Sequence, residues 1–95
     1  MKYPKEYLDE IKTRLKVSTV VSKSVKLKKR GKEFVGLSPF KTEKTPSFTV
    51  NDEKGFYHCF STAEHGNIFD FIMKTQNLKF GEAVKYLANL AGMQP

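Results

Sequence analysis

The stretch from residue 38 to residue 62 constrains the fold more than any other part of the chain. It begins with a short turn-forming segment at residues 38–41 (S-P-F-K) and ends with a second one at residues 59–62 (C-F-S-T). We call these knuckle 1 and knuckle 2. Between them, residues 47–51 and 56–60 flank the turn-forming string N-D-E-K-G, which predicts an antiparallel hairpin of two strands.

Two knuckles separated by a hairpin are the layout of a zinc ribbon, in which each knuckle supplies two ligands in a C-x₂-C or C-x₂-H pattern. The corresponding positions here are Ser38 and Lys41 in knuckle 1, and Cys59 and Thr62 in knuckle 2. Only Cys59 is of a metal-binding type, whereas a structural zinc site needs four convergent thiolate or imidazole ligands. The sequence therefore predicts the frame of a zinc ribbon with no metal.

His58 and His65, together with Cys59 and Glu64, form an alternative set of metal ligands. Neighbouring residues of a strand point to opposite faces, so His58 and Cys59 are not expected to converge. We therefore favour a structural role for His58, and we interpret Cys59 as a small buried hydrophobic residue.

The remaining pattern predicts one α+β domain over residues 1–95. A small antiparallel sheet is flanked by N-terminal and C-terminal helices. Apolar residues at helical spacing predict the helices, and alternation predicts the strands. No apolar run is long enough to span a membrane and no secretory signal opens the chain, so we expect a cytoplasmic protein. The expected helices cover residues 4–15, 18–22, 67–76 and 80–90, and the expected strands cover residues 25–28, 33–37, 47–51 and 56–60.

Positive charge is concentrated in the first half of the chain. The net charge is +7, and six of the ten residues from 23 to 32 are basic while none is acidic. Such a block predicts a surface that contacts a polyanion, although a solvated hairpin without a partner is the simpler alternative. The candidate DNA contacts are Lys26, Lys28, Lys29, Arg30, Lys32, Lys44 and Lys54.

Tyr57 is the candidate for stacking on a nucleic-acid base, because strand alternation directs it away from Phe56 and His58. The alternative for Tyr57 is ordinary packing against a helix. The sequence alone leaves these two interpretations open.

Several ordered strings carry a resemblance to a known family. They include E-K-T-P-S-F at residues 43–48, F-Y-H-C-F at residues 56–60 and H-G-N at residues 65–67. Over nearly its whole length the chain resembles the N-terminal domain of bacterial DnaG-type DNA primase. That family carries Cys, His, Cys and Cys at the four positions occupied here by Ser38, Lys41, Cys59 and Thr62, so this chain departs from the zinc ligand set.

The resemblance implies a domain that binds the single-stranded DNA template and helps to choose the initiation site. It also implies a longer primase at the replication fork, with a TOPRIM-type polymerase domain that uses Mg²⁺ or Mn²⁺ and a C-terminal contact to the replicative helicase. Neither of these parts lies within the 95 residues. The chain shows no carboxylate cluster for metal-assisted nucleotidyl transfer and no P-loop, so we expect this domain to be non-catalytic and to need no cofactor of its own.

Two other functions stay open at this stage. One is a stand-alone nucleic-acid-binding module of a phage or plasmid with the same fold. The other is a protein-interaction module whose basic face docks an acidic partner. A reading frame that continues past Pro95 into a TOPRIM-like domain would favour the primase, and weak DNA binding that is insensitive to salt would favour the interaction module.

Without zinc, other contacts have to hold the knuckles. We expect packing of aromatic rings around them, together with hydrogen bonds from Ser38 and Thr62 that bridge the two knuckles. We expect Lys41 to turn outward to solvent or phosphate. The aromatic residues expected to pack there are Phe34, Phe40, Phe48, Phe56 and Phe60.

Overall fold

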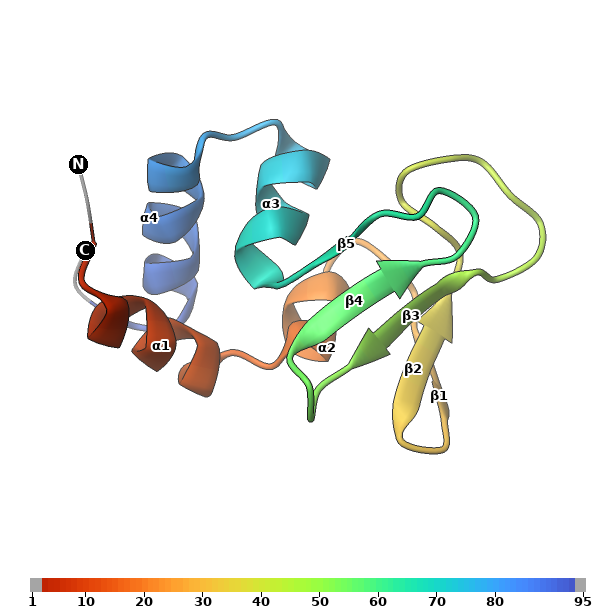
Figure 1. Cartoon of the computed structure of the whole chain (residues 1–95), viewed down its shortest axis with the longest axis horizontal. Helices are drawn as coiled ribbons and strands as arrows, with labels where there is room; N and C mark the ends of the chain where they lie inside the picture. Colours follow the sequence, from red (N-terminus) through yellow and green to blue (C-terminus); the bar gives the residue numbers. More distant parts are fainter. Residues whose placement is uncertain (1–2, 94–95) are drawn as a thin grey trace.

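The computed structural model describes residues 3–93 and shows a five-stranded antiparallel sheet with helices packed on one side (Figure 1). The strands lie in the sheet in chain order, from β1 at one edge to β5 at the other. This arrangement confirms the expected α+β fold. The elements are α1 (Lys5–Arg14), α2 (Val17–Val21), β1 (Lys28–Arg30), β2 (Glu33–Gly36), β3 (Phe48–Asn51), β4 (Phe56–Cys59), β5 (His65–Gly66), α3 (Ile68–Gln76) and α4 (Phe80–Leu90).

The inner face of the sheet, which the helices cover, is built by alternate residues of β3 and β4. Phe48 pairs with Cys59 and Val50 pairs with Tyr57, and all four side chains are fully buried. The ring of Tyr57 stacks on that of Phe48 with centroids 5.4 Å apart and meets the edge of Phe71 from α3 at 5.6 Å. Aromatic rings of this size dominate the burial of apolar surface, so this cluster anchors the sheet to the helices.

The outer face of the sheet carries the other half of each strand. The register pairs Thr49 with His58 and Lys28 with Val35, so these residues share one face. The described helices pack on the opposite side and leave this face open (Figure 1). Phe60, just beyond the end of β4, is 68% exposed and its ring lies 4.3 Å from that of His58. We define the outer face as Lys28, Arg30, Glu33, Val35, Thr49, Asn51, Phe56, His58, Phe60 and His65.

Helices α2 and α3 contact the sheet, and α4 packs on α3 and α1. The last two helices, α3 and α4, are followed by left-handed residues. The side chain of Asn67 accepts from the backbone N–H of Phe69 and Asp70, and Asp70 accepts from the N–H of Asn67, which makes a capping box. Asn77 closes α3 with φ of 54°, and Gly92 follows α4 with φ of 74°. Within residues 3–93, none of the helices has the length and apolar character needed to cross a membrane.

Three local expectations are wrong. Strand β1 begins at Lys28 instead of residue 25, because the Val25 N–H still bonds to the Val21 carbonyl at the end of α2. Helix α2 begins at Val17 instead of residue 18, so Ser18 lies inside the helix and does not cap it. Instead its backbone N–H and hydroxyl both donate to the carboxylate of Asp52, at 2.8 and 2.5 Å. The short strand β5 was not expected.

Two aromatic residues on opposite faces of the sheet test this architecture. Phe48→Ala should lower the free energy of unfolding by about 3–5 kcal/mol, because it leaves a cavity in the inner-face cluster. Phe60→Ala should lower it by about 1 kcal/mol or less, because the ring is exposed and has mainly the His58 ring to lose. Chemical denaturation of the two variants measures the difference, and similar losses would contradict the assignment of the two faces.

Candidate functional site

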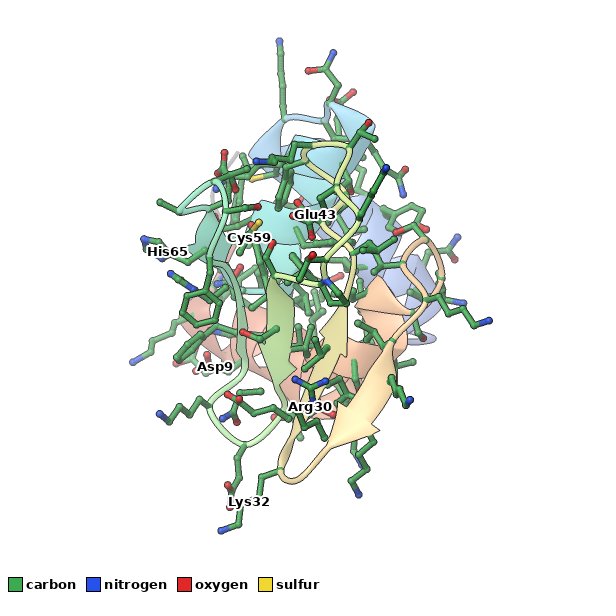
Figure 2. All side chains as sticks on the ribbon, turned by 90° about the vertical axis from the view of Figure 1, so that its right-hand side faces the viewer. Asp9, Arg30, Lys32, Glu43, Cys59 and His65 are labelled. Carbon is green, nitrogen blue, oxygen red and sulfur yellow. The ribbon has the colours of Figure 1, made fainter. Side chains whose placement is uncertain are left out.

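The two knuckles lie next to each other at one end of the sheet. In Figure 1 the long loop between β2 and β3 and the turn after β4 meet at this end, and Figure 2 places Glu43 of the loop beside Cys59. The Sγ atom of Cys59 lies 3.2 Å from the Oγ atom of Ser38, so one ligand position of each knuckle is in contact with the other. The zinc-ribbon frame is therefore preserved.

The residues at the four ligand positions do not fit a zinc ion. The Ser38 hydroxyl accepts from the N–H of Phe40 at 3.0 Å, and the Thr62 hydroxyl accepts from the N–H of Glu64 at 3.3 Å. Lys41 is exposed, and its ammonium group would repel a cation. Within residues 3–93 no group of three or more His, Cys, Asp and Glu is placed to hold a metal.

The expected bridge between the knuckles takes a different form in the structure. The Ser38 and Thr62 hydroxyls each accept from a backbone N–H two residues further along the chain, so neither hydroxyl spans the two knuckles by bonding to backbone. The hydrogen bond between the knuckles comes from the Cys59 thiol, which donates to the Ser38 hydroxyl at 3.2 Å. The bonds to backbone are local because a short hydroxyl side chain reaches an N–H group two residues away more easily than one in the other knuckle.

Cys59 is a buried thiol surrounded by hydroxyl groups. Its sulfur lies 3.2 Å from Ser38 Oγ, 3.3 Å from Ser61 Oγ and 3.8 Å from Ser47 Oγ. Burial raises the pKa of the thiol, but hydrogen bonds from Ser38, Ser61 and Thr62 outweigh it and lower the pKa to about 6. Cys59 is thus buried, as the sequence suggested, but its surroundings are more polar than those of a small hydrophobic residue.

Glu43, which the sequence did not single out, is the centre of this cluster. Its Oε2 atom accepts from the backbone N–H of Ser38 at 2.9 Å and of Ser47 at 3.1 Å. Its Oε1 atom accepts from the hydroxyls of Ser47 at 2.7 Å and Ser61 at 3.0 Å. Hydrogen bonds to Ser47 and to the Ser38 backbone lower the pKa of the Glu43 carboxyl, and the smaller effect of burial opposes them.

The alternative metal set does not assemble. The rings of His58 and His65 face each other at 6.2 Å, but they lie on the outer face whereas Cys59 lies on the inner face. Glu64 is engaged by Lys74, whose Nζ atom lies 2.6 Å from its Oε1. The alternation argument against this set is confirmed.

Aromatic packing around the knuckles is only partly as expected. Phe48 is buried, and Phe34 and Phe40 are half-buried against the core. Phe56 and Phe60 are 42% and 68% exposed, so the expectation that they help to replace the metal is wrong. Both point outward because they lie in register with the outer face.

Tyr57 is not available for base stacking. Its side chain is 0% exposed and lies among Phe40, Phe48 and Phe71. The packing alternative is therefore correct, and burial raises the pKa of its phenol. The polar residues Thr49 and Asn51 in the partner strand were the signal that the face of Phe56 and His58, not that of Tyr57, is solvent-facing.

The structure brings some of the candidate cations together and separates others. Lys28 and Arg30 lie on the outer face, Lys32 lies in the hairpin that follows, and Lys54 lies in the turn between β3 and β4. Figure 2 shows Arg30 and Lys32 at the end of the sheet away from Glu43 and Cys59. Alternation places Lys29 on the opposite face from Arg30. Lys26 precedes β1, and Lys44 is exposed in the loop between β2 and β3.

A shallow pocket marks the middle of the outer face. Its volume is about 300 Å³, and aromatic and polar groups line it together. The Asn51 amide donates to the one carboxylate there, that of Glu33, at 3.5 Å. An open face with exposed rings beside cations has the composition of a platform for single-stranded nucleic acid. The lining residues are Glu33, Thr49, Asn51, Lys54, Phe56, His58 and Phe60.

Residues 3–95 match the family described as the CHC2 zinc finger, the zinc ribbon of DnaG. Relatives called DNA primase are 43% identical in Haemophilus influenzae, 44% in Escherichia coli K12 and 46% in Pseudomonas putida, each over 91 residues and 96% of this chain. The chain spans only 14–16% of the length of these relatives.

A solved structure gives the same fold. The crystal structure of the Aquifex aeolicus primase, described as its zinc-binding and RNA polymerase domains, superposes with a TM-score of 0.87 at 27% identity. The match covers 94% of this chain and 22% of that one. The fold here is thus that of a primase N-terminal region, although the ligand positions differ from the family's zinc set.

The degenerate ligand positions lead to a prediction about metal content. The purified protein should contain no stoichiometric zinc and should melt at the same temperature with and without a chelator, because hydroxyls and an ammonium group cannot hold the ion. The triple variant Ser38→Cys, Lys41→His, Thr62→Cys should bind one zinc ion, because the side chains of Ser38 and Thr62 already lie beside the Cys59 sulfur. Metal analysis and thermal melting measure both, and tightly bound zinc in the unaltered chain would contradict the prediction.

Proposed function

The chain belongs to the CHC2 zinc finger family of DnaG-type primases, and from this membership we propose that it is the template-binding N-terminal domain of a bacterial DNA primase. In this proposal the domain binds single-stranded DNA and is not catalytic by itself. The full protein would synthesise RNA primers for DNA replication from nucleotides with Mg²⁺ or Mn²⁺, in a polymerase domain that these 95 residues do not include. Its other partners would be that polymerase domain and the replicative helicase.

The observation that carries the proposal is the composition of the outer face. Phe56, His58 and Phe60 offer ring faces and edges at the surface, and Lys28 and Arg30 supply positive charge on the same face. Bases of a single strand stack on exposed rings while cations follow its phosphates. The net charge of +7 adds long-range attraction for a polyanion.

A protein-interaction module is the second candidate, and the exposed Phe60 is the observation that favours it. An apolar side chain that is 68% exposed can bury itself against a protein as well as against a base. The two functions differ in their dependence on salt, because phosphate contacts release counterions and apolar contacts do not.

Binding of single-stranded DNA should follow the charges of the outer face. We expect weak binding whose affinity falls with salt, with a log–log slope of about −0.7 for each phosphate contacted. Arg30→Glu should weaken binding and reduce this slope, whereas Lys85→Glu on α4 should have little effect. Glu33→Gln changes the charge of this face in the opposite direction. It should strengthen binding because it removes the carboxylate of the face. Fluorescence anisotropy of a labelled oligonucleotide measures all three, and equal losses for Arg30 and Lys85 would refute the assignment of the face.

The aromatic contribution is tested by two exposed phenylalanines. Phe60→Ala should weaken DNA binding by about 1 kcal/mol, or about fivefold, because a base loses its stacking partner. Phe80, which is 40% exposed at the start of α4, provides the matched control, and Phe80→Ala should leave the affinity unchanged. Equal effects would show that Phe60 does not stack on a base.

The domain alone should make no primers. Incubated with template, nucleotides and Mg²⁺, the 95-residue chain should yield no RNA, because residues 3–93, which the structure describes, hold no carboxylate cluster that could bind the metal ions. Denaturing gels of the products measure this outcome. Primer synthesis by the purified domain would contradict the proposal that this domain binds template and a separate domain is catalytic.

A further inference from the structure

One side chain contacts both knuckles. The Glu43 carboxylate accepts from the Ser38 N–H in knuckle 1 and from the Ser61 hydroxyl in knuckle 2. It also accepts from both the N–H and the hydroxyl of Ser47, where the long loop returns to β3. The two knuckles that a metal ion would join in a zinc ribbon, and the start of β3 as well, are thus joined by one carboxylate.

We infer that Glu43 is the centre of a hydrogen-bonded clasp that holds the two knuckles together in place of the metal. The clasp consists of Glu43, Ser38, Ser47, Ser61 and Cys59. A carboxylate has two oxygens with about four acceptor sites, so it can serve several donors at once, as a metal serves several ligands.

The geometry of the donors supports this role. All the groups aimed at Glu43 are N–H or O–H donors, and the distances of 2.7–3.1 Å are those of well-formed bonds to an ionised acceptor. The Ser47 hydroxyl also lies 2.8 Å from the Ser61 hydroxyl, and Ser61 lies 3.3 Å from the Cys59 sulfur. The contacts therefore run without a break from the Ser38 backbone to Cys59.

Packing alone does not account for the closeness of the knuckles. Phe60 of knuckle 2 is exposed, Phe40 of knuckle 1 is half-buried, and Lys41 is exposed. The Phe40 ring packs on Phe48 and Tyr57 of the core, so the side-chain contacts that join the two knuckles directly are the polar ones around Glu43 and the Ser38–Cys59 contact. Without this carboxylate, the Ser38 and Ser47 N–H groups would lose their acceptor, which is costly for partly buried groups.

The first test replaces the carboxylate by its neutral isostere. Glu43→Gln should lower the melting temperature by at least about 5 °C, because an amide presents a donor where the clasp needs an acceptor. Glu53→Gln, an equal change at an exposed carboxylate in the β3–β4 turn, should leave the melting temperature unchanged. Amide exchange at Ser38 and Ser47 should become faster in Glu43→Gln, while exchange at Val50 in β3 should not. Equal melting temperatures for the two variants would overturn the inference.

The second test asks whether Glu43 and a metal ion both stabilise the contact between the two knuckles. Glu43→Gln is introduced into the zinc-loaded variant Ser38→Cys, Lys41→His, Thr62→Cys, and its effect on the melting temperature is compared with that in the unaltered chain. A clasp that replaces the metal predicts a smaller loss when zinc is present. Equal losses would mean that Glu43 only orders the loop, which would overturn the inference.

A further variant keeps the inference testable if the triple variant takes up no zinc. Ser61→Ala removes the donor by which knuckle 2 reaches Glu43, so it should lower the melting temperature and speed amide exchange in knuckle 2. Thr13→Ala, an equal loss of an exposed hydroxyl on α1, is the matched control and should not affect knuckle 2. Unchanged exchange in Ser61→Ala would overturn the inference.

Discussion

The period-two alternation of β3 and β4 is the constraint on which the rest of the structure depends. It puts Phe48, Val50, Tyr57 and Cys59 under the helices and leaves the residues between them on the outer face. A shift of one residue in register would exchange the two sets and expose the aromatic core. The same alternation therefore fixes the core and the open aromatic surface. It also directs the side chain of Cys59 to the inner face.

Most of the fold could be predicted because its signals are local. Helical spacing located α1, α3 and α4, and the expected start of α3 at residue 67 coincides with the Asn67 cap of that helix. Where prediction failed, a distant group was responsible: α2 is held by Asp52 from a turn 34 residues away, which no local capping rule reveals. The late start of β1 has a related cause, since Val25 is drawn into the core at the end of α2.

The candidate site was less predictable, and Tyr57 shows why. Alternation tells which residues share a face, but only the partner strand tells which face is covered. Thr49 and Asn51 beside Phe56 and His58 identify the outer face once the register is known. Glu43 could not be recognised for a different reason. A glutamate in a polar loop resembles a solvated surface residue until the fold brings Ser38, Ser47 and Ser61 around it.

A carboxylate and a metal ion can both join the two knuckles, but they carry opposite charges. Zinc draws in anionic and neutral electron-pair donors, whereas Glu43 draws in N–H and O–H groups, so a chain cannot use both at one point with the same ligands. Serines at positions 38, 47 and 61 fit the second solution, and Lys41 is compatible with it because the Glu43 arrangement needs no cation at the ligand positions. The Ser38 hydroxyl thus stands where the family has a zinc ligand, while Glu43 and Ser47 belong to a string that the chain shares with that family. The zinc-ribbon frame persists because it needs the knuckles joined, and it does not require that a metal join them.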